Sequence, residues 1–324
     1  MRGAWVMRYV ENMNSQTAGD YEAWSDLVRV RVPAKVNVAL CVGRRGDDGY
    51  HPLHTVFQAL SLYDQVEVTP ADEGAIDVDI TGEDAEEIPR DGTDLATRAA
   101  RLVRERYGRP DQGAHIRVTK SIPVAAGLAG GSADAAATLL ACSVLWDLDT
   151  DPGALQALAG ELGADVPFAL LGGTALGTGR GTELLPLLTR GRYHWVLAFA
   201  RRGLSTPSVY QRFDDTAGEG RDGLPPGLLE ALASGDVPGV GARLCNDLQG
   251  PALELYGELA QTLRYGQGLD GVVGAVVSGS GPTCAFLLDE ARAAKAVADE
   301  VARLPEVRGT LVAVGPVPGA QLLG

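Results

Sequence analysis

"PVAAGLAGGSADAAATLL", residues 123–140, places three glycines within five residues, directly before an alanine-rich run. The alanines predict a helix, because alanine has the highest helix propensity, and the glycines predict a turn with unusual backbone angles at its start. A helix N-terminus presents free N–H groups and the positive end of the helix dipole. Glycines at that end let a ligand approach the backbone, so the stretch predicts a phosphate site.

A second interpretation of the glycines is purely structural, because a glycine-rich turn also packs a strand tightly against a helix. The spacing excludes two named phosphate motifs: GxxxxGK[ST] is absent, and Gly127, Gly130 and Gly131 do not satisfy GxGxxG. Ser132 is expected at or near the N-cap, where its hydroxyl can cap the helix or contact a phosphate.

The composition indicates a globular protein and excludes several functions. The 324 residues are 45% hydrophobic, enough for two packed domains, and the net charge of −14 argues against unspecific nucleic-acid binding. The four cysteines are far apart and no histidines have zinc-finger spacing, so neither a disulfide framework nor a metal site is predicted and a cytoplasmic location is expected. No apolar run approaches the roughly 18 residues of a membrane span.

Strand-like and helix-like segments do not alternate regularly, which predicts an α+β protein rather than a doubly wound sheet. We expect a disordered tail over residues 1–26, one domain over residues 27–187 and a second over residues 188–324. Within them, the patterns predict separate strands at 27–33 and 35–42, a helix at 94–107 ending at Gly108, strand and loop at 164–184, and a helix at 241–248.

The opening stretch resembles the phosphate-binding motif of the GHMP kinases, P-x-x-x-G-L-G-G-G-S-S. Ala129 and Ala133 stand where a glycine and a second serine are frequent. The resemblance implies a two-domain fold with a ribosomal S5 domain 2-like N-terminal domain and a ferredoxin-like C-terminal domain. It also implies that ATP phosphates bind the loop, through Pro123, Gly127, Leu128, Ala129, Gly130, Gly131 and Ser132.

Such a kinase needs a substrate hydroxyl held in line with a γ-phosphate. Only three lysines occur, and Lys35 stands among apolar strand residues, where an ammonium group needs a partner. Asp165 follows a predicted helix end and precedes a Val-Pro pair, which fixes it in a loop. Its carboxylate can there accept the hydroxyl proton, while Lys35 keeps the carboxylate ionised. The alternative is an ordinary structural ion pair, or two residues that never meet.

Six further segments narrow the resemblance: "VPAKVNVALCV", "DDGYHPLHTVFQALSLYDQVEV", "LGADVPFALLGGTALGTGRG", "LSTPSVY", "LCNDLQ" and "VVSGSGPTCAF". With the glycine loop they are similar to the branch of the family that phosphorylates the 2-hydroxyl of 4-diphosphocytidyl-2-C-methyl-D-erythritol in non-mevalonate isoprenoid synthesis. The resemblance makes Lys35 and Asp165 the catalytic pair and places Asn37 and His51 near the substrate. Tyr50 and Tyr210 would sandwich the cytosine ring.

Other interpretations remain open for these positions. Tyr50 can be a turn residue, Tyr210 a helix core residue, and Lys120, which matches a nucleotide-binding lysine, a charge at a strand end. Asp94 and Leu95 match a pair that contacts adenine, but Asp94 replaces the usual asparagine and, when ionised, accepts hydrogen bonds without donating.

The resemblance implies ATP with Mg²⁺ as cofactors, a small-molecule substrate, and a monomer or weak homodimer. No metal ligands are identified. Two rivals remain: a GHMP kinase acting on homoserine, mevalonate or a sugar, and a nucleotide-binding regulator without catalysis. The GYH segment with Tyr210 argues against the first, and the presence of both Lys35 and Asp165 argues against the second.

Overall fold

A computed structural model of the protein describes residues 27–324 except residues 48, 217–220 and 222. The predicted tail, residues 1–26, lies outside the described residues. Within the described part, no helix is both long and apolar enough to cross a membrane. All four cysteines are free, and the sulfurs of the closest pair, Cys41 and Cys245, lie 3.9 Å apart.

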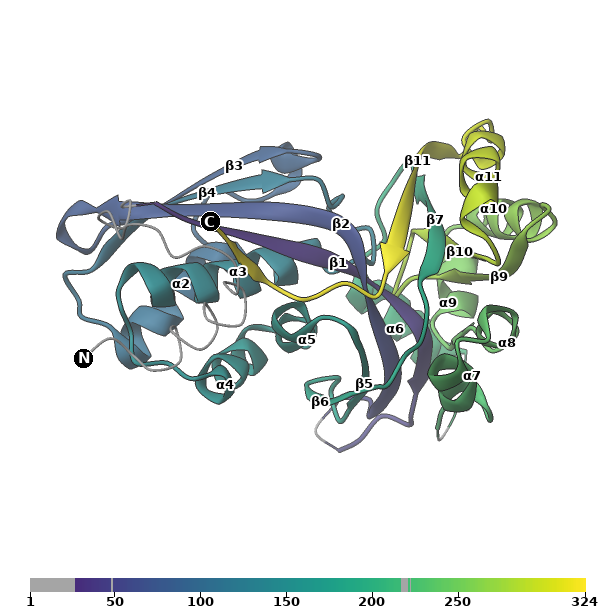
Figure 1. Cartoon of the computed structure of the whole chain (residues 1–324), viewed down its shortest axis with the longest axis horizontal. Helices are drawn as coiled ribbons and strands as arrows, with labels where there is room; N and C mark the ends of the chain where they lie inside the picture. Colours follow the sequence, from purple (N-terminus) through teal and green to yellow (C-terminus); the bar gives the residue numbers. More distant parts are fainter. Residues whose placement is uncertain (1–26, 48, 217–220, 222) are drawn as a thin grey trace, which may run out of the picture.

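The first of two sheets is built on a long antiparallel pair of strands, β1 (Val28–Val42) and β2 (Leu53–Ala71) (Figure 1). Its central order is β12-β1-β2-β4-β3, with β5 added beside β2, β6 beside β5 and β8 beside β1. The other strands of this sheet are β3 (Ile76–Gly82), β4 (Gly113–Lys120), β5 (Thr174–Thr178), β6 (Glu183–Pro186), β8 (Cys245–Asn246) and β12 (Gln321–Leu323).

The expectation of two strands at 27–33 and 35–42 is wrong, because β1 runs unbroken through Pro33. The pairing with β2 shifts register between Pro33 and Ala34, and such irregularities are where a sheet tolerates a residue without an N–H. Beyond the shift, Lys35 and Asn37 are two residues apart and so project from the same face of the strand.

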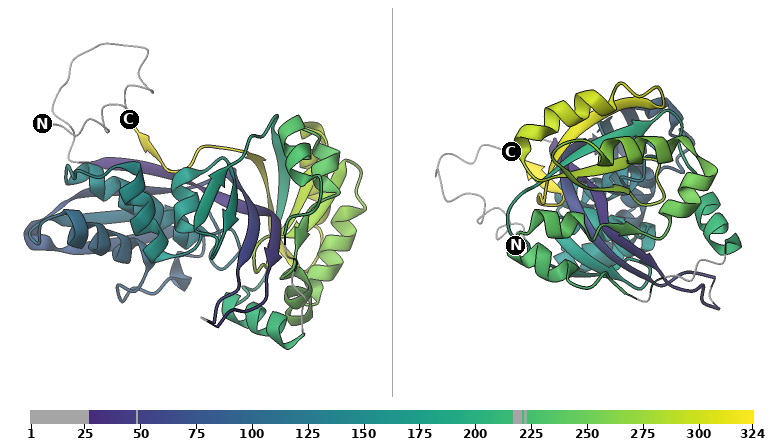
Figure 2. Two further views of the ribbon diagram at one scale, coloured as in Figure 1. Left: turned by 90° about the horizontal axis from the view of Figure 1, so that it is seen from below. Right: turned by 90° about the vertical axis from the view of Figure 1, so that its right-hand side faces the viewer.

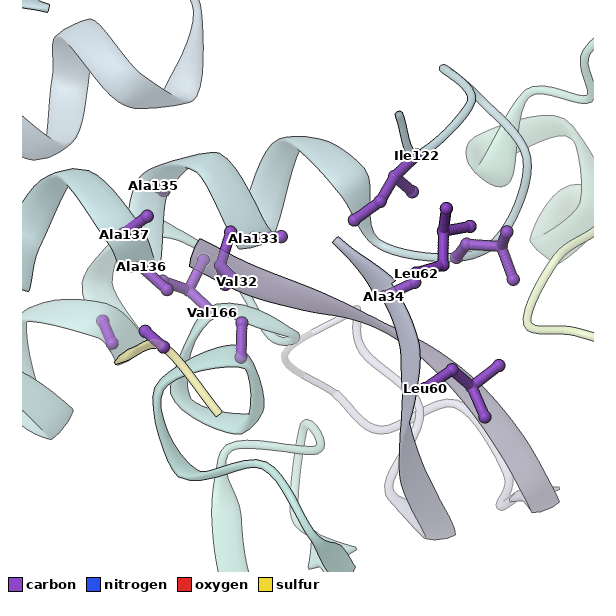
Figure 3. Packing of buried hydrophobic residues seen from close by; sticks show 14 of the residues in the cluster. Val32, Ala34, Leu60, Leu62, Ile122, Ala133, Ala135, Ala136, Ala137 and Val166 are labelled. Atoms are coloured by element: carbon purple, nitrogen blue, oxygen red, sulfur yellow. The ribbon is translucent and has the colours of Figure 1, made fainter. Parts of the chain in front are cut away.

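Four helices cover one face of this sheet: α2 (Leu95–Tyr107), α3 (Gly130–Leu145), α4 (Pro152–Leu162) and α5 (Val166–Leu171) (Figure 1). The predicted helix at 94–107 with a C-cap at Gly108 is confirmed. Helix α3 is buried on almost all sides, as expected for a helix that is apolar all round. Ala133 and Ala136 lie near Val32 of β1, and their small side chains permit close packing of the helix on the sheet (Figure 3).

Two further expectations are corrected. Residues 164–184 do not begin as strand and loop, because α5 forms first, with Pro167 in its first turn where no N–H is needed. Residues 241–248 are not a helix, because α8 (Val237–Gly241) ends and β8 pairs with β1 instead. The Asn246 amide anchors this change by donating to the carbonyls of Val277 and Gly279, contacts that helix propensity cannot anticipate.

The second sheet has the order β11-β7-β10-β9, with all neighbours antiparallel. Helices separate β7 from β9 and β10 from β11, which is the split βαβ arrangement of a ferredoxin-like domain and confirms the predicted fold class. Its strands are β7 (Tyr193–Ala200), β9 (Val272–Val277), β10 (Cys284–Leu288) and β11 (Val307–Gly315). The remaining helices are α6 (Thr206–Asp215), α7 (Leu228–Ser234), α9 (Gln249–Leu255), α10 (Glu258–Gln267) and α11 (Ala294–Val301).

The chain crosses between the two parts more than once (Figure 2). Both β8 and β12 lie after residue 188, yet they pair with β1 in the first sheet. Fully buried Trp195 on β7 donates its indole N–H to the Gln58 side-chain oxygen on β2, at 2.9 Å. The two sheets therefore share a buried polar contact as well as apolar surface.

Trp195→Phe is expected to lower the free energy of unfolding, because it removes the donor to Gln58 inside the core. A buried polar group left without its partner costs about 1–3 kcal/mol, and the smaller ring adds to the loss. Urea unfolding followed by circular dichroism measures the change. Tyr265→Phe, which removes an exposed hydroxyl bound to Glu300, is the control and should move the midpoint little. Equal unfolding midpoints for the two variants would show that the hydrogen bond from Trp195 to Gln58 contributes no stability.

Candidate active site

A cavity of about 1060 Å³ lies between the glycine loop, the β1–β2 pair, α5 and α6. One predicted site residue, Leu128, does not line this cavity. Its side chain is buried in the core, and its backbone carbonyl accepts a hydrogen bond from the Lys35 backbone N–H at 3.2 Å. The cavity brings the others together: Lys35, Asn37, Tyr50, His51, Asp94, Leu95, Lys120, Pro123, Gly127, Ala129, Gly130, Gly131, Ser132, Asp165 and Tyr210.

Lys35 and Asp165 meet in this cavity, with the ammonium nitrogen 3.7 Å from a carboxylate oxygen. The Lys35 side chain is only 7% exposed and donates to Asn37 Oδ1 at 2.6 Å, whereas Asp165 is 31% exposed. Asp165 precedes α5, but its side chain does not cap that helix. The lysine is thus fixed, while the carboxylate can reach a ligand in the cavity.

Polar contacts behind Lys35 hold it in place. Asn37 donates to Thr55 Oγ1 at 2.8 Å, and the Thr55 hydroxyl donates to the carbonyl of Ala39 at the same distance. The Lys35 ammonium also lies 5.6 Å from the centre of the Phe57 ring, which favours a cation. The sequence analysis did not single out Thr55. Its place on β2, the strand next to the one that carries Asn37, follows from the strand pairing.

The glycine loop packs against the turn that joins β9 to β10. Gly127 has φ +76°, and a Cβ there would lie 2.2 Å from the carbonyl oxygen of Ser278. Ser278 in turn donates its hydroxyl to the Gly127 carbonyl at 3.0 Å. Gly127 therefore serves packing, as the structural interpretation expects. A Cβ added at Gly131 would meet only Leu95, at 3.6 Å, so that side of the loop is open.

Helix α3 begins at Gly130, so Ser132 is its third residue, near the N-cap as expected but not at it. The cap position belongs to Ala129, whose left-handed backbone, φ +61°, is unusual for an alanine. Among the described residues, no side chain caps this end. The first N–H groups of a helix lack intrahelical acceptors, so those of Gly130, Gly131 and Ser132 are available to an anion in the cavity.

Lys120 is not a surface charge at a strand end. It is buried, with its ammonium group bound to the carboxylates of Asp64 on β2 and Asp134 on α3, the latter at 2.7 Å. Burial lowers the pKa of Lys120, but the two carboxylates outweigh burial, so its pKa lies above the usual value. The cluster of these three residues keeps Lys120 charged at the edge of the cavity.

The same cluster holds the chain that enters the glycine loop. Asp64 Oδ1 accepts from the N–H groups of Ser121 and Ile122, at 2.6 and 2.8 Å. Asp134 is buried, and burial raises its pKa above the usual value, although Lys120 opposes the shift. Its Oδ1 has no hydrogen-bond partner among the described residues. The sequence analysis missed both aspartates because neither belongs to the recognised glycine pattern.

Asp94 has a structural task in addition to any ligand contact. It is the N-cap of α2, and its carboxylate accepts from the Thr97 N–H at 2.8 Å and the Thr97 hydroxyl at 2.6 Å. Leu95 begins the helix and lies against Gly131. Both residues line the cavity on the glycine-loop side.

Tyr50, His51 and Tyr210 lie at the opposite side of the cavity. Tyr50 is 54% exposed, and the His51 ring packs against Tyr210 with centres 5.5 Å apart. Burial, helped by the charge of Asp165, raises the pKa of Tyr210 to about 12, so its hydroxyl stays protonated. Two residues missed by sequence reasoning also lie here: Arg180, 3.5 Å above the Tyr50 ring, and Asp214.

Known proteins resemble the chain along most of its length. The model of the GHMP kinases N terminal domain matches residues 94–173, and that of the GHMP kinases C terminal domain matches residues 228–306. The 4-diphosphocytidyl-2-C-methyl-D-erythritol kinase of Cutibacterium acnes is 51% identical over 301 residues, covering 91% of this chain and 97% of the relative. The enzyme of that name from Mycolicibacterium smegmatis is 52% identical over 302 residues, covering 91% and 92%.

Solved structures agree with these relatives. A crystal structure of 4-(cytidine 5'-diphospho)-2C-methyl-D-erythritol kinase superposes with a TM-score of 0.73 at 36% identity, covering 88% of this chain and 98% of that one. A homoserine kinase from Cytophaga hutchinsonii superposes with a TM-score of 0.72, covering 94% and 100%, but at 18% identity it shows the shared fold alone.

Lys120→Met is expected to destabilise the protein strongly, because it leaves two buried carboxylates without their cation. Removing one partner of a buried ion pair typically costs about 3–5 kcal/mol. Chemical unfolding of the variant and the parent measures the difference. Lys295→Met is the matched control, since Lys295 pairs with Asp299 on an exposed helix surface and its loss should leave the midpoint almost unchanged. A parental midpoint for Lys120→Met would show that the cluster contributes no stability.

Proposed function

The chain belongs to the 4-diphosphocytidyl-2-C-methyl-D-erythritol kinases of the GHMP kinase family, and from this premise we propose how its cavity performs the reaction. The protein phosphorylates 4-diphosphocytidyl-2-C-methyl-D-erythritol at the 2-hydroxyl with ATP, a step of the non-mevalonate pathway. The observation that carries the assignment of roles is the meeting of Lys35 and Asp165 in the same cavity as the open N-terminus of α3.

Asp165 accepts the proton of the substrate hydroxyl while the hydroxyl oxygen attacks the γ-phosphorus of ATP. The bond from that phosphorus to the bridging oxygen breaks, and ADP leaves with the electron pair. Lys35 keeps Asp165 ionised and stabilises negative charge on the reacting oxygens, a role that fits its fixed position on β1. Such phosphoryl transfer depends mostly on positioning and charge.

The glycine loop takes the phosphates of the nucleotide. Donors of Gly130, Gly131 and Ser132 lie at the α3 N-terminus, where the helix dipole adds positive potential. Lys120 would act by holding the strand that leads into the loop through its ion pairs with Asp64 and Asp134, while Asp94 and Leu95 bound the side where the adenosine would lie.

The other end of the cavity takes the cytidine part of the substrate. Tyr50 and Tyr210 would stack on the two faces of the base, and stacking on an aromatic side chain contributes about 1–3 kcal/mol per base. Backbone groups around His51 would bind the edge of the base, with Asn37 nearer the methylerythritol part.

Mg²⁺ would enter with the nucleotide. Within the described residues, no three His, Cys, Asp or Glu side chains are grouped so that they could hold a metal ion. This fits a Mg²⁺ carried mainly by phosphate oxygens and water, as is usual for this ion at nucleotide sites. When bound, it would neutralise charge between the β- and γ-phosphates, and the chain's own residues would orient the acceptor.

We also propose that the enzyme acts in the cytoplasm as a monomer or weak homodimer. Its four free cysteines are compatible with a reducing compartment. The cavity is lined from a single chain, so the proposed chemistry needs no residue from a second copy.

A substrate comparison tests the proposed function against its nearest rival, because homoserine kinase shares the fold. Purified protein with MgATP is expected to release ADP with 4-diphosphocytidyl-2-C-methyl-D-erythritol and to release almost none with homoserine. Homoserine offers no base to stack between the two tyrosines. A coupled assay for ADP measures both rates. Preference for homoserine, or ATP binding without turnover of either compound, would refute the proposal.

Asp165→Asn is expected to lower kcat by about 100-fold or more, because the amide cannot accept the proton. Affinity for ATP should change little, since the loop donors are unaffected. Steady-state kinetics and nucleotide titration separate the two effects. Asp111→Asn, which alters an exposed carboxylate paired with Arg109, is the control and should keep parental rates. If Asp165→Asn turned over at the parental rate, Asp165 would not be the base.

A further inference from the structure

The loop between β1 and β2 carries Tyr50 and His51 away from the sheet. Its backbone is held by the Gly43 N–H bound to the Pro52 carbonyl at its base and by the Gly46 N–H bound to the Tyr50 carbonyl, both at 2.8 Å. These bonds close the loop on itself, but they do not set its distance from α6, which carries Tyr210. A further contact must fix that spacing if the two tyrosines are to form opposite walls of one site.

Asp214 on α6 supplies this contact through His51. The carboxylate Oδ1 lies 3.0 Å from His51 Nε2, and His51 Nδ1 lies 2.9 Å from the carbonyl oxygen of Gly43. A carbonyl oxygen and an ionised carboxylate both only accept, so the two contacts together require an N–H donor on each ring nitrogen of His51. The His51 side chain is mostly buried and is held edge-on against Phe213, with ring centres 5.6 Å apart.

The second oxygen of the same carboxylate reaches the other limb of the loop. Asp214 Oδ2 lies 3.4 Å from an Arg45 guanidinium nitrogen, and Arg45 Nε donates to the Gly49 carbonyl at 2.9 Å. Gly49 and His51 are the two neighbours of Tyr50 in the chain. One carboxylate therefore restrains the backbone on both sides of Tyr50.

Asp214 is also linked to the opposite aromatic wall, because it stands four residues after Tyr210 on α6. Residues at that spacing lie above one another on one face of a helix. Both residues line the cavity. The position of Asp214 relative to Tyr210 is thus fixed by the helix, and its position relative to Tyr50 is fixed by His51 and Arg45.

We propose that Asp214 is a positioning residue for pyrimidine binding, which sets the gap between Tyr50 and Tyr210 by fastening the β1–β2 loop to α6. The proposal rests on the proposed function and deepens it. Asp214 acts through His51 and Arg45 and takes no part in phosphoryl transfer, since Lys35 and Asp165 perform that step. Its loss should therefore weaken binding of the cytidine part and spare the chemical step.

Asp214→Ala is expected to raise KM for 4-diphosphocytidyl-2-C-methyl-D-erythritol about tenfold, which corresponds to about 1.4 kcal/mol of binding free energy. The kcat value and KM for ATP should stay within about twofold, because the nucleotide end is untouched. Titration with cytidine 5'-diphosphate should show the same loss of affinity without any turnover.

Two variants separate positioning from a general effect on the fold. Asp214→Asn keeps a side-chain oxygen that can accept from His51 Nε2, so it should recover most of the parental KM. Asp215→Asn is the matched control: the adjacent carboxylate on α6 binds Gln211 in the same helix, and this change should leave all constants at parental values. Arg45→Ala combined with Asp214→Ala should raise KM by less than the product of the single effects, because both act on one contact.

Three results would overturn the inference. One is that Asp214→Ala, made in a parent that phosphorylates the cytidine substrate, has a KM for that substrate within twofold of the parental value. Another is an equal worsening of both KM values together with kcat and the unfolding midpoint, which would indicate a structural role. The third is Asp214→Asn behaving like Asp214→Ala. A parent that does not phosphorylate the cytidine substrate would refute the proposed function instead.

Discussion

The buried cluster of Lys120 with Asp64 and Asp134 is the constraint on which the nucleotide end of the site depends. It joins β2, β4 and α3 directly below the glycine loop, and Asp64 also holds the two N–H groups that lead into the loop. Charges removed from water are costly unless each is paired, so the three elements have little freedom to separate. The start of α3 is therefore placed before any phosphate binds, and its free donors need no rearrangement to receive one.

Glycines complete this arrangement, because they have no side chain at the points where two backbone segments meet. Gly127 lies against the carbonyl of Ser278, so the phosphate loop of the first part and the β9–β10 turn of the second part touch without intervening side chains. A Cβ on Gly279 of the same turn would lie 3.2 Å from the Lys35 ammonium. Contact between the two parts of the protein and placement of the catalytic lysine thus depend on the same pair of turns.

Patterns within short segments predicted the fold family, and they identified most of the residues that line the candidate site. The glycine loop, Lys35 and Asp165 could be recognised because each lies in a distinctive local sequence. Asp64 and Asp214 could not, because their roles arise from partners far away in the chain, Ser121 and Lys120 for one and His51 and Arg45 for the other. The short strand β8 was taken for a helix for the same reason, since its pairing with β1 overrides its local propensity.

The two ends of the cavity are held in different ways: buried charges hold one end, and partly exposed charges hold the other. At the proposed nucleotide end the anchoring charges are almost fully buried, so the start of α3 is held rigidly without a ligand. At the cytidine end, Asp214 and Arg45 are partly exposed and hold a loop whose Tyr50 is open to solvent. Exposed ion pairs are weak, so the mostly buried contact of His51 with Asp214 contributes more to holding this loop than the contact of the exposed Arg45. Under the proposed function, the buried cluster would hold the phosphate donor and Asp214 would hold the wall on which the base stacks, so that Lys35 and Asp165 would meet the acceptor hydroxyl between two separately anchored ends.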